Sequence, residues 1–448
     1  MKKSKLYIET YGCQMNIVDS EVVASILTRA DYEMTDDPSM ADLILLNTCS
    51  IRENAEQRIR GRLDNLAHYK KGSPGLIMGV IGCMAERVKD KLLEEEKVVD
   101  LVVGPDAYRD LPRLINAAGH GEKGVNTLLS LEETYGDISP VRLDKNHVSA
   151  FISIMRGCNN MCAYCVVPYT RGRERSRDPQ TILHEVSEII DAGYHEVTLL
   201  GQNVDSYNWS DSINDQEADF PSLLRNVARL DPRLRVRFST SHPKDMSDNV
   251  LETIARYPNI CKSIHLPVQS GSDAVLSRMK RRYTRADYLD RIRAIREIIP
   301  AASVSTDIIA GFCGETEDDH QATLSLMEDT GFDFSFMFKY SERPGTLAAR
   351  KYADDVPEET KTRRLNEIIE LQNHLSLESK KKDLGKHFEV LTEGFSKKSD
   401  LHLFGRTTQN KVVVFPASGY HPGDYVTIGV EDCTSATLLG KPIKSTAL

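Results

Sequence analysis

The sequence predicts an α/β protein of three parts, and three regularities along its 448 residues support this fold class. In the first part, three apolar runs each end at a cysteine and continue into a polar stretch with helical spacing. In the second part, strand-like and helix-like runs alternate about six times. Near the C-terminus the apolar spacing changes to a period of two. We therefore expect an N-terminal doubly wound parallel sheet, a central open (β/α)6 partial barrel and a small C-terminal antiparallel β-barrel.

Composition and charge narrow the class of protein. Lys plus Arg number 57 and Asp plus Glu 66, a net charge of −9, which excludes a uniformly basic nucleic-acid binder but allows local basic patches. No apolar run approaches membrane-spanning length and no signal peptide is evident, so we expect a cytoplasmic protein without membrane contact. In that compartment, nine cysteines indicate metal ligands or catalytic groups rather than disulfides.

The first part, residues 3–120, places a cysteine after each of three predicted strands. The four strands predicted here are Leu6–Thr10, Leu43–Asn47, Leu76–Ile81 and Val98–Val103. The cysteines are Cys13, Cys49 and Cys83. Since the carboxyl ends of parallel strands meet at one edge of a sheet, the three thiols can converge there. One such cysteine could be a small buried hydrophobe, but three at equivalent positions favour a site of three thiolates.

Residues 121–143 are predicted to be a linker because they carry Gly, a Ser-Pro pair and little periodicity. Residues 144–376 follow, with predicted strands Phe151–Met155, Val197–Leu200, Val236–Ser239, Ser263–Leu266, Val304–Ile309 and Phe334–Phe338. Asp178 before Pro179 suits a helix start, and Gly193 and Gly331 suit helix ends. Active sites of barrels of this kind gather at the carboxyl ends of the strands.

The segment Gly157–Cys165 follows the first of these strands and carries Cys158, Cys162 and Cys165, spaced C-x3-C-x2-C. Thiolates at this density normally hold zinc or an iron–sulfur cluster. Structural zinc takes four ligands, and no fourth Cys or His lies close by in sequence. A cubane cluster held by three cysteines leaves one iron open for chemistry. The alternatives are free thiols, or zinc with a distant fourth ligand.

The third part, residues 377–441, follows a predicted connecting helix at 357–384. Its predicted strands are Phe388–Leu391, Leu401–Phe404, Val412–Phe415 and Tyr425–Ile428. From residue 380 onward, ten Lys or Arg residues face seven Asp or Glu residues. A small β-barrel with a basic surface is a common form of RNA-binding domain, and an ordinary solvated surface is the alternative.

Together these motifs closely resemble those of the radical S-adenosylmethionine (SAM) methylthiotransferases, along essentially the whole chain. The segment Thr10–Asn16 is similar to the opening motif of the branch that acts on tRNA. Asn47–Cys49, Gly82-Cys83 and Val167–Arg177 are also like that branch. The Leu-Gly-Cys-Pro-Lys-Asn type of opening, usual in the branch that modifies a ribosomal protein, is absent. The C-terminal barrel, with Gly405–Thr407, resembles a TRAM domain, an RNA-binding module.

The resemblance implies two 4Fe-4S clusters. Cys158, Cys162 and Cys165 would hold the cluster whose open iron binds SAM. Cys13, Cys49 and Cys83 would hold an auxiliary cluster that carries or supplies the inserted sulfur. One SAM would methylate that sulfur, and a second would yield the 5′-deoxyadenosyl radical that takes hydrogen from C2 of the adenine.

The strand ends also offer SAM contacts. Many radical-SAM proteins have Gly-Gly-Glu after the second strand, where this chain has Gly201-Gln202-Asn203. The predicted SAM contacts are Gln202, Ser239, Gln269 and Phe312, each with a turn or packing role as the alternative. Arginine suits phosphate contacts, and four arginines alternate beside the cysteine loop. The predicted tRNA contacts are Arg171, Arg173, Arg175, Arg177, Lys397, Lys398 and Arg406.

The resemblance therefore implies methylthiolation of C2 of N6-isopentenyladenosine at tRNA position 37, beside the anticodon. Its implied partners are the anticodon stem-loop of tRNA and an electron donor such as flavodoxin or ferredoxin, and we expect a monomer. Two rivals stay open. One is the same chemistry on threonylcarbamoyl-adenosine or on a ribosomal protein. The other is a non-catalytic zinc- or RNA-binding protein.

Overall fold

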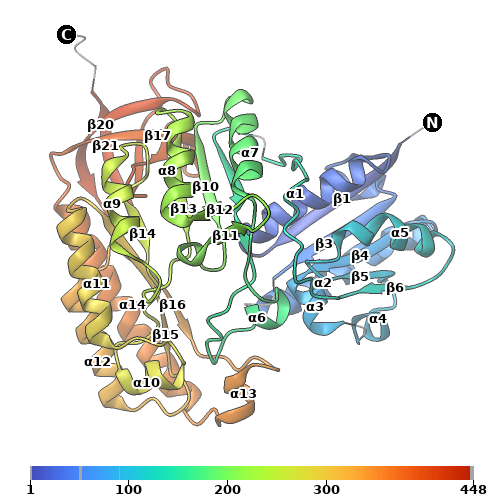
Figure 1. The fold of residues 1–448 in the computed structure, drawn as a ribbon, viewed down its shortest axis with the longest axis horizontal. Helices are drawn as coiled ribbons and strands as arrows, with labels where there is room; N and C mark the ends of the chain where they lie inside the picture. Colours follow the sequence, from blue (N-terminus) through green and yellow to red (C-terminus); the bar gives the residue numbers. More distant parts are fainter. Residues whose placement is uncertain (1–2, 50–52, 90, 145, 444–448) are drawn as a thin grey trace.

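The computed structural model describes residues 3–49, 53–89, 91–144 and 146–443, and it has the expected three-part α/β architecture (Figure 1). The N-terminal part is a six-stranded parallel sheet in the order β2-β1-β3-β4-β5-β6. Its strands are β1 (Ser4–Tyr11), β2 (Tyr32–Met34), β3 (Leu43–Thr48), β4 (Ile77–Gly82), β5 (Leu101–Val103) and β6 (Gly124–Asn126). β3 is buried along its whole length, as a central parallel strand covered on both faces should be.

Two strands of this sheet were not predicted. β2 and β6 are three residues each, too short to show a period, and β6 lies in the stretch expected to be a linker. The helices around the sheet are α1 (Gln14–Thr28), α2 (Glu53–Gly72), α3 (Cys83–Val88), α4 (Lys91–Glu95) and α5 (Leu111–Gly119). Separate apolar cores form on the two faces, one containing Leu43 and Leu45 and the other Ile44 and Leu46.

The central part contains six parallel strands in two sheets, ordered β13-β10-β7 and β14-β15-β16. They are β7 (Ser149–Ser153), β10 (Glu196–Leu200), β13 (Arg235–Ser239), β14 (Ser263–His265), β15 (Ser303–Ala310) and β16 (Phe334–Lys339). A bridge between Val236 and Ile260 links the sheets. Among the described residues no ladder joins β7 to β16, so the barrel stays open between them, as predicted.

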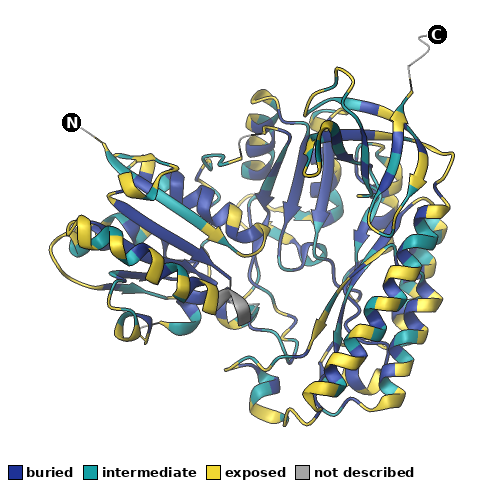
Figure 2. Cartoon of the chain, turned by 180° about the vertical axis from the view of Figure 1, so that it is seen from behind, coloured by how far each residue is buried: buried dark blue, intermediate teal, exposed yellow. Residues whose placement is uncertain are grey.

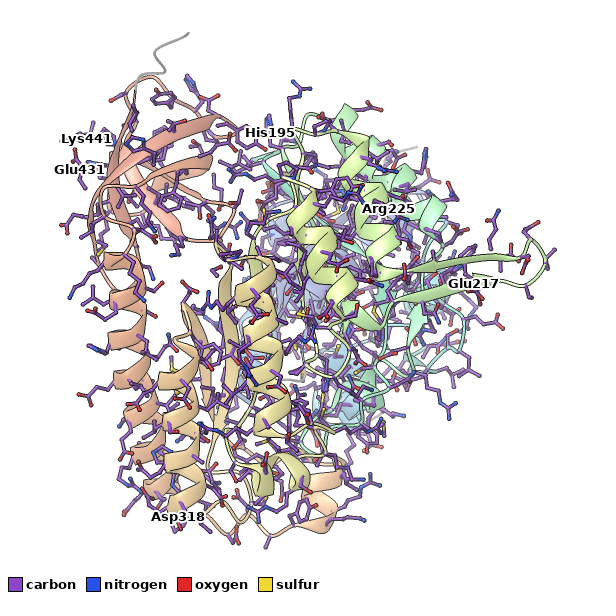
Figure 3. All side chains as sticks on the ribbon, turned by 60° about the vertical axis from the view of Figure 1, so that its left-hand side comes forward. His195, Glu217, Arg225, Asp318, Glu431 and Lys441 are labelled. Atoms are coloured by element: carbon purple, nitrogen blue, oxygen red, sulfur yellow. The ribbon has the colours of Figure 1, made fainter. Side chains whose placement is uncertain are left out.

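Helices cover the outside of this partial barrel, and most of its strands are buried, whereas the outer strand β16 is largely exposed (Figures 1 and 2). The larger ones are α7 (Pro179–Asp191), α8 (Phe220–Leu230), α9 (Asp248–Arg256), α11 (Arg285–Ile298) and α12 (Glu317–Thr330). The predicted caps are present: Asp178 accepts a hydrogen bond from the Gln180 backbone N–H, and Gly331 ends α12 at φ 62°. A hairpin of β11 (Asn208–Asp211) and β12 (Gln216–Asp219), not predicted, carries Glu217 away from the body (Figure 3).

The long helix α14 (Glu358–Lys381) leads into the C-terminal barrel and runs through residue 376, where we placed a domain boundary. The barrel closes in the order β17-β18-β19-β21-β20, with β17 (His387–Ser396), β18 (Ser399–Arg406), β19 (Val412–Pro416), β20 (Tyr425–Cys433) and β21 (Leu438–Pro442). We expected a wholly antiparallel barrel, but the β19–β21 pair is parallel. No described helix combines the length and apolar composition needed to cross a membrane.

The C-terminal barrel closes the amino end of the partial barrel. Arg235 Nη1 donates to the Arg406 carbonyl at 2.6 Å, and Arg237 Nη2 donates to the Thr407 carbonyl at 2.9 Å. Ser303 Oγ donates to the Gln409 carbonyl at 2.6 Å. These donors lie within the first three residues of β13 and β15, so the barrel sits at the end of the strands opposite the carboxyl ends that carry the cysteines.

Candidate active site

Both sets of three cysteines line one cavity of about 300 Å³ between the N-terminal sheet and the partial barrel. The lining cysteines are Cys13, Cys49, Cys83, Cys158, Cys162 and Cys165. All nine cysteines of the chain are described, and none is in a disulfide. The fold thus brings together six thiols that lie up to 152 residues apart in sequence (165 minus 13).

Glycines let the N-terminal thiols approach one another at the sheet edge. Cys13 caps α1 directly after β1, and Cys83 begins α3 directly after β4. A Cβ on Gly12 would come within 2.8 Å of Cys49 Cβ, and Gly82 has φ 91°. A side chain on Gly12 would press on Cys49, and one on Gly82 would lie 2.4 Å from Asn47 Oδ1 at the end of β3.

Two buried asparagines fix the backbone under these thiols. Cys13 Sγ donates to Asn16 Oδ1 at 3.3 Å, and Asn16 Nδ2 donates to Asn47 Oδ1 at 2.9 Å. Asn47 Nδ2 returns a hydrogen bond to the Asn16 carbonyl at 2.8 Å. This closed network ties the turn after β1 to the end of β3, and it gives a structural role to the asparagines of the first two cysteine motifs.

The second cysteine loop is held by backbone hydrogen bonds from two other segments. The Ala163 N–H donates to the Met279 carbonyl at 2.9 Å, and the Ala348 N–H donates to the Ala163 carbonyl at 2.7 Å. Gly157 enters the loop at φ 81°, where a Cβ would lie 1.9 Å from the Arg173 carbonyl oxygen. Only glycine fits this crossing of two chain segments.

Each set of thiols has one buried arginine beside it. Arg171 Nε lies 3.1 Å from Cys83 Sγ, and Arg281 Nη1 lies 3.3 Å from Cys162 Sγ. Arg281 was not predicted as a site residue, because nothing in its local sequence distinguishes it from its exposed neighbour Lys280. A cation that points an N–H donor at a sulfur stabilises the thiolate form of that cysteine. The same contact would stabilise a negatively charged cluster bound by the thiolate.

The pKa values of the thiols differ within the N-terminal set, because burial raises the pKa of Cys83 while that of Cys13 is lowered. A hydrogen bond from Cys49, with the nearby Arg171 charge, lowers the pKa of Cys13 to about 6. Burial raises the pKa of Cys158 to about 11 and of Cys165 to about 12. Thiols with such raised values ionise when a metal replaces the proton. Two separate sets of three thiols, each set with an arginine, therefore fit two clusters that each leave one iron open.

Three predicted tRNA contacts are instead buried, and two of them, Arg171 and Arg175, pair across the interface between the N-terminal and central parts. The pairs are Arg171 with Asp19 at 2.7 Å, Arg175 with Asp106 at 2.9 Å, and Arg177 with Glu185. Arg156, fully buried, joins the same network through Asp19 at 2.9 Å and Asp106 at 3.5 Å. The prediction that these three side chains bind phosphate was wrong, because their guanidinium groups already neutralise buried carboxylates. Arg173 is exposed and keeps that prediction.

Three of the four predicted SAM contacts line the cavity: Gln202, Ser239 and Gln269. Phe312 is not among the described lining residues. It is fully buried, with its ring 6.4 Å from that of Tyr164 and 5.0 Å from that of Tyr340, so it supports the cysteine loop from behind.

Unpartnered polar atoms gather beside these residues. Among described groups, Gln202 Oε1, Ser241 Oγ and His242 Nε2 are buried without a hydrogen-bond partner, and all three residues line the cavity. Burial also lowers the pKa of His242 to about 2, so its imidazole is neutral. Buried polar atoms without partners are costly, so this wall suits a polar ligand such as the methionine and ribose groups of SAM.

On the C-terminal barrel, the predicted tRNA contacts divide. Lys397 and Lys398 are exposed in the turn between β17 and β18. Arg406 instead pairs with Glu393 and, at 3.6 Å, with Glu196 of β10. The ion pair with Glu196 favours a role for this side chain in docking the barrel onto the central part over its predicted phosphate contact.

Comparisons with known proteins match all three parts. Models of uncharacterized protein family UPF0004, the radical SAM superfamily and the TRAM domain match residues 5–104, 152–327 and 381–443. The tRNA-2-methylthio-N(6)-dimethylallyladenosine synthase of Amoebophilus asiaticus is 59% identical over 446 residues, 97% of this chain and 92% of that protein. The protein of the same name from Bacteroides thetaiotaomicron is 57% identical over 439 residues, 98% and 96% of the two chains.

Solved structures extend the likeness at the level of fold alone. The radical S-adenosylmethionine methyltransferase TsrM of Kitasatospora setae, with cobalamin and a 4Fe-4S cluster bound, superimposes with a TM-score of 0.58. It is 14% identical, and the match covers 77% of this chain and 74% of that one.

Proposed function

Because the chain belongs to the family of tRNA-2-methylthio-N(6)-dimethylallyladenosine synthases, we propose that it methylthiolates C2 of N6-isopentenyladenosine in tRNA, at position 37. The observation that carries this proposal is the single cavity lined by both sets of three cysteines. Sulfur insertion by radical chemistry needs the sulfur source and the radical source within reach of one adenine, and one cavity meets that need.

We assign the residues as follows. Cys158, Cys162 and Cys165 hold the SAM-binding 4Fe-4S cluster, and Cys13, Cys49 and Cys83 hold the auxiliary one. When bound, the clusters and SAM supply reductive cleavage of the sulfonium and the sulfur that is inserted. Gln202, Ser239 and Gln269 orient SAM from the strand ends, and the buried walls exclude water from the radical.

Contacts across the interface between the N-terminal and central parts fix the position of one set of thiols relative to the other. Arg171 joins Cys83 to Asp19, and Arg156 joins Asp19 to Asp106. We also propose that the chain divides into residues 3–120, 121–143, 144–376 and 377–441. The proposed enzyme is a cytoplasmic monomer, and its electron donor is of the flavodoxin or ferredoxin type. The TRAM domain binds the tRNA, with Lys397 and Lys398 as phosphate contacts.

The test is a nucleoside digest of tRNA from cells that lack the protein. We expect 2-methylthio-N6-isopentenyladenosine to disappear and N6-isopentenyladenosine to accumulate. The wild-type gene should reverse both changes, and a Cys158→Ala variant should reverse neither. Loss of a methylthiolated threonylcarbamoyl-adenosine or ribosomal protein instead would redirect the substrate assignment. Protein that carries zinc and no iron would rule out the chemistry.

A further inference from the structure

The outer strand β16 exposes three phenylalanines at alternate positions. Phe334, Phe336 and Phe338 are 48%, 46% and 41% exposed, although large apolar side chains normally lie inside. The side chains between them behave differently, since Ser335 is buried and Met337 packs against the core. Alternate residues of a strand point to one face, so the three rings form one stripe, the β16 stripe.

The register shows that this face is the inside of the partial barrel. Phe334 lies opposite Ser305 on β15, and Phe336 lies opposite Asp307. Asp307 lines the cavity of the six cysteines, so the β16 stripe is on the same wall as the active site. β16 has no strand on its other side among the described residues, which leaves the stripe at the open edge of the barrel.

The rings are held in place without being covered. Phe334 and Phe336 meet edge to face at 4.8 Å between centroids, and the Phe336 ring meets that of His265 at 5.7 Å. His265 is itself fixed by Ser305 at 3.0 Å and Asp307 at 3.3 Å. An edge-to-face contact occupies one face of only one of its two rings, so other ring faces remain available for stacking.

The two ends of the stripe lead to the two places that the substrate must touch. At the Phe334 end, the adjacent Asp333 pairs with Lys411 of the TRAM domain at 3.5 Å. At the Phe338 end, the chain continues to Ala348, whose N–H donates to Ala163 in the cysteine loop at 2.7 Å. The stripe therefore spans the wall between the RNA-binding domain and the reaction cavity.

We propose that the β16 stripe stacks unpaired bases of the RNA loop that flank the target adenosine, an inference that rests on the proposed function. In one common class of RNA-binding domain, aromatic side chains on one face of a sheet stack two or three bases of single-stranded RNA. Such stacking is tolerant of sequence, because every base has a π face. A duplex keeps its bases stacked inside, so the stripe selects an unpaired loop and helps to hold the target base at the cavity.

The experiment uses the anaerobic holoenzyme and an isopentenylated anticodon stem-loop RNA with 2-aminopurine beside the target position. Phe336→Ala and Phe338→Ala should each weaken binding of this RNA by roughly tenfold and reduce the fluorescence change on binding. Phe336→Tyr should retain both signals, whereas Phe336→Leu, which is apolar but cannot stack, should not. Ile213→Ala, at a 90% exposed position on the β11–β12 hairpin, is the matched control and should bind as wild type.

Other outcomes overturn the inference. Unchanged affinity and fluorescence in both alanine variants would exclude stacking on the stripe. An equal loss of affinity for a duplex without a loop would show that the variants disturb phosphate binding instead. If the alanine variants shift a dimer toward monomer and leave RNA binding intact, a second copy of the chain covers the stripe. If the wild-type protein makes no methylthiolated product, the proposed function is refuted. If the alanine variants are active and bind RNA normally, only this inference is refuted.

Discussion

Arg171 Nη2 lies 2.7 Å from Asp19 Oδ2, and both side chains are buried where the N-terminal sheet meets the partial barrel. The same guanidinium touches Cys83 through Nε at 3.1 Å. One side chain thus links the interface to a predicted cluster ligand. Removing one partner of a buried ion pair leaves an uncompensated charge, which typically costs about 3–5 kcal/mol.

We therefore expect Arg171→Gln to destabilise the protein by roughly 3–5 kcal/mol and to lower iron by up to half. Arg171→Lys keeps the positive charge, although a lysine ammonium lacks the guanidinium fork that contacts Asp19 and Cys83 together. It should therefore retain more iron than Arg171→Gln. The measurements are iron per chain and thermal unfolding under anaerobic conditions. Arg173→Gln, an exposed position in the same loop, should stay within about 0.5 kcal/mol of wild type. Equal behaviour of Arg171→Gln and Arg173→Gln would contradict the interface role.

The two sets of thiols should be separable by mutation. Protein purified without oxygen should carry about eight irons, as two four-iron clusters require. Replacing Cys158, Cys162 and Cys165 with Ala should leave about half of the iron and abolish SAM cleavage. Replacing Cys13, Cys49 and Cys83 should also leave about half, but SAM should still be cleaved reductively with no sulfur attached. Methylthiolated product from the second variant would disprove the auxiliary-cluster assignment.

Gly157 should tolerate no side chain. A Cβ there would lie 1.9 Å from the Arg173 carbonyl, and φ 81° is unfavourable for other residues. Gly157→Ala should displace the cysteine loop and lose the SAM-binding cluster, which iron content and loss of SAM cleavage would report. Gly61→Ala is the control: Gly61 lies in α2 with nothing within 4 Å of its Cβ position. Since Ala is the better helix former, this control should be neutral or stabilising by up to about 1 kcal/mol.

Glu86 should make stability depend on pH. Burial raises its pKa from 4.5 to about 7, and its Oε2 has no hydrogen-bond partner among the described groups. A folded pKa above the unfolded one means that the protonated form favours folding. This contribution is complete below about pH 4.5 and is lost as pH rises through 7. Glu86→Gln should therefore raise the melting temperature more at pH 8 than at pH 5, and Glu94→Gln, at an exposed position, is the control for removing a surface carboxylate.

The sequence predicted most strands of the parallel sheets, but not β2 and β6, because these two short strands lack clear apolar runs. The rule that strand ends meet at one edge brought Cys13, Cys49 and Cys83 together. The same reasoning failed for the alternating arginines. From sequence alone, an arginine in a polar loop is expected to be exposed to solvent. The carboxylate partners of Arg171 and Arg175 lie 152 and 69 residues away, so the local sequence does not indicate them. Arg281 and the β16 stripe were missed for the same reason. Their roles depend on which distant segment faces them, and a local pattern does not contain that information.

The last prediction separates two kinds of cation on the C-terminal barrel. Lys397 and Lys398 are exposed in a turn, whereas Arg406 is tied to Glu393 and Glu196 at the docking surface. A phosphate contact contributes to the salt dependence of RNA binding, and its loss lowers the slope of log affinity against log salt by about one. Each Lys→Gln change should therefore weaken tRNA binding at low salt and flatten this slope, and the double variant should do so further.

Arg406→Gln should behave differently, because Arg406 pairs with Glu196 of β10 and so helps to hold the barrel against the central part. We expect it to leave the salt slope unchanged and to increase proteolysis in the connection between α14 and β17, since the barrel is less firmly docked. The measurements are tRNA binding across a salt series and limited proteolysis, with iron content as the check on folding. A flattened slope in Arg406→Gln together with wild-type slopes in the lysine variants would reverse the two assignments.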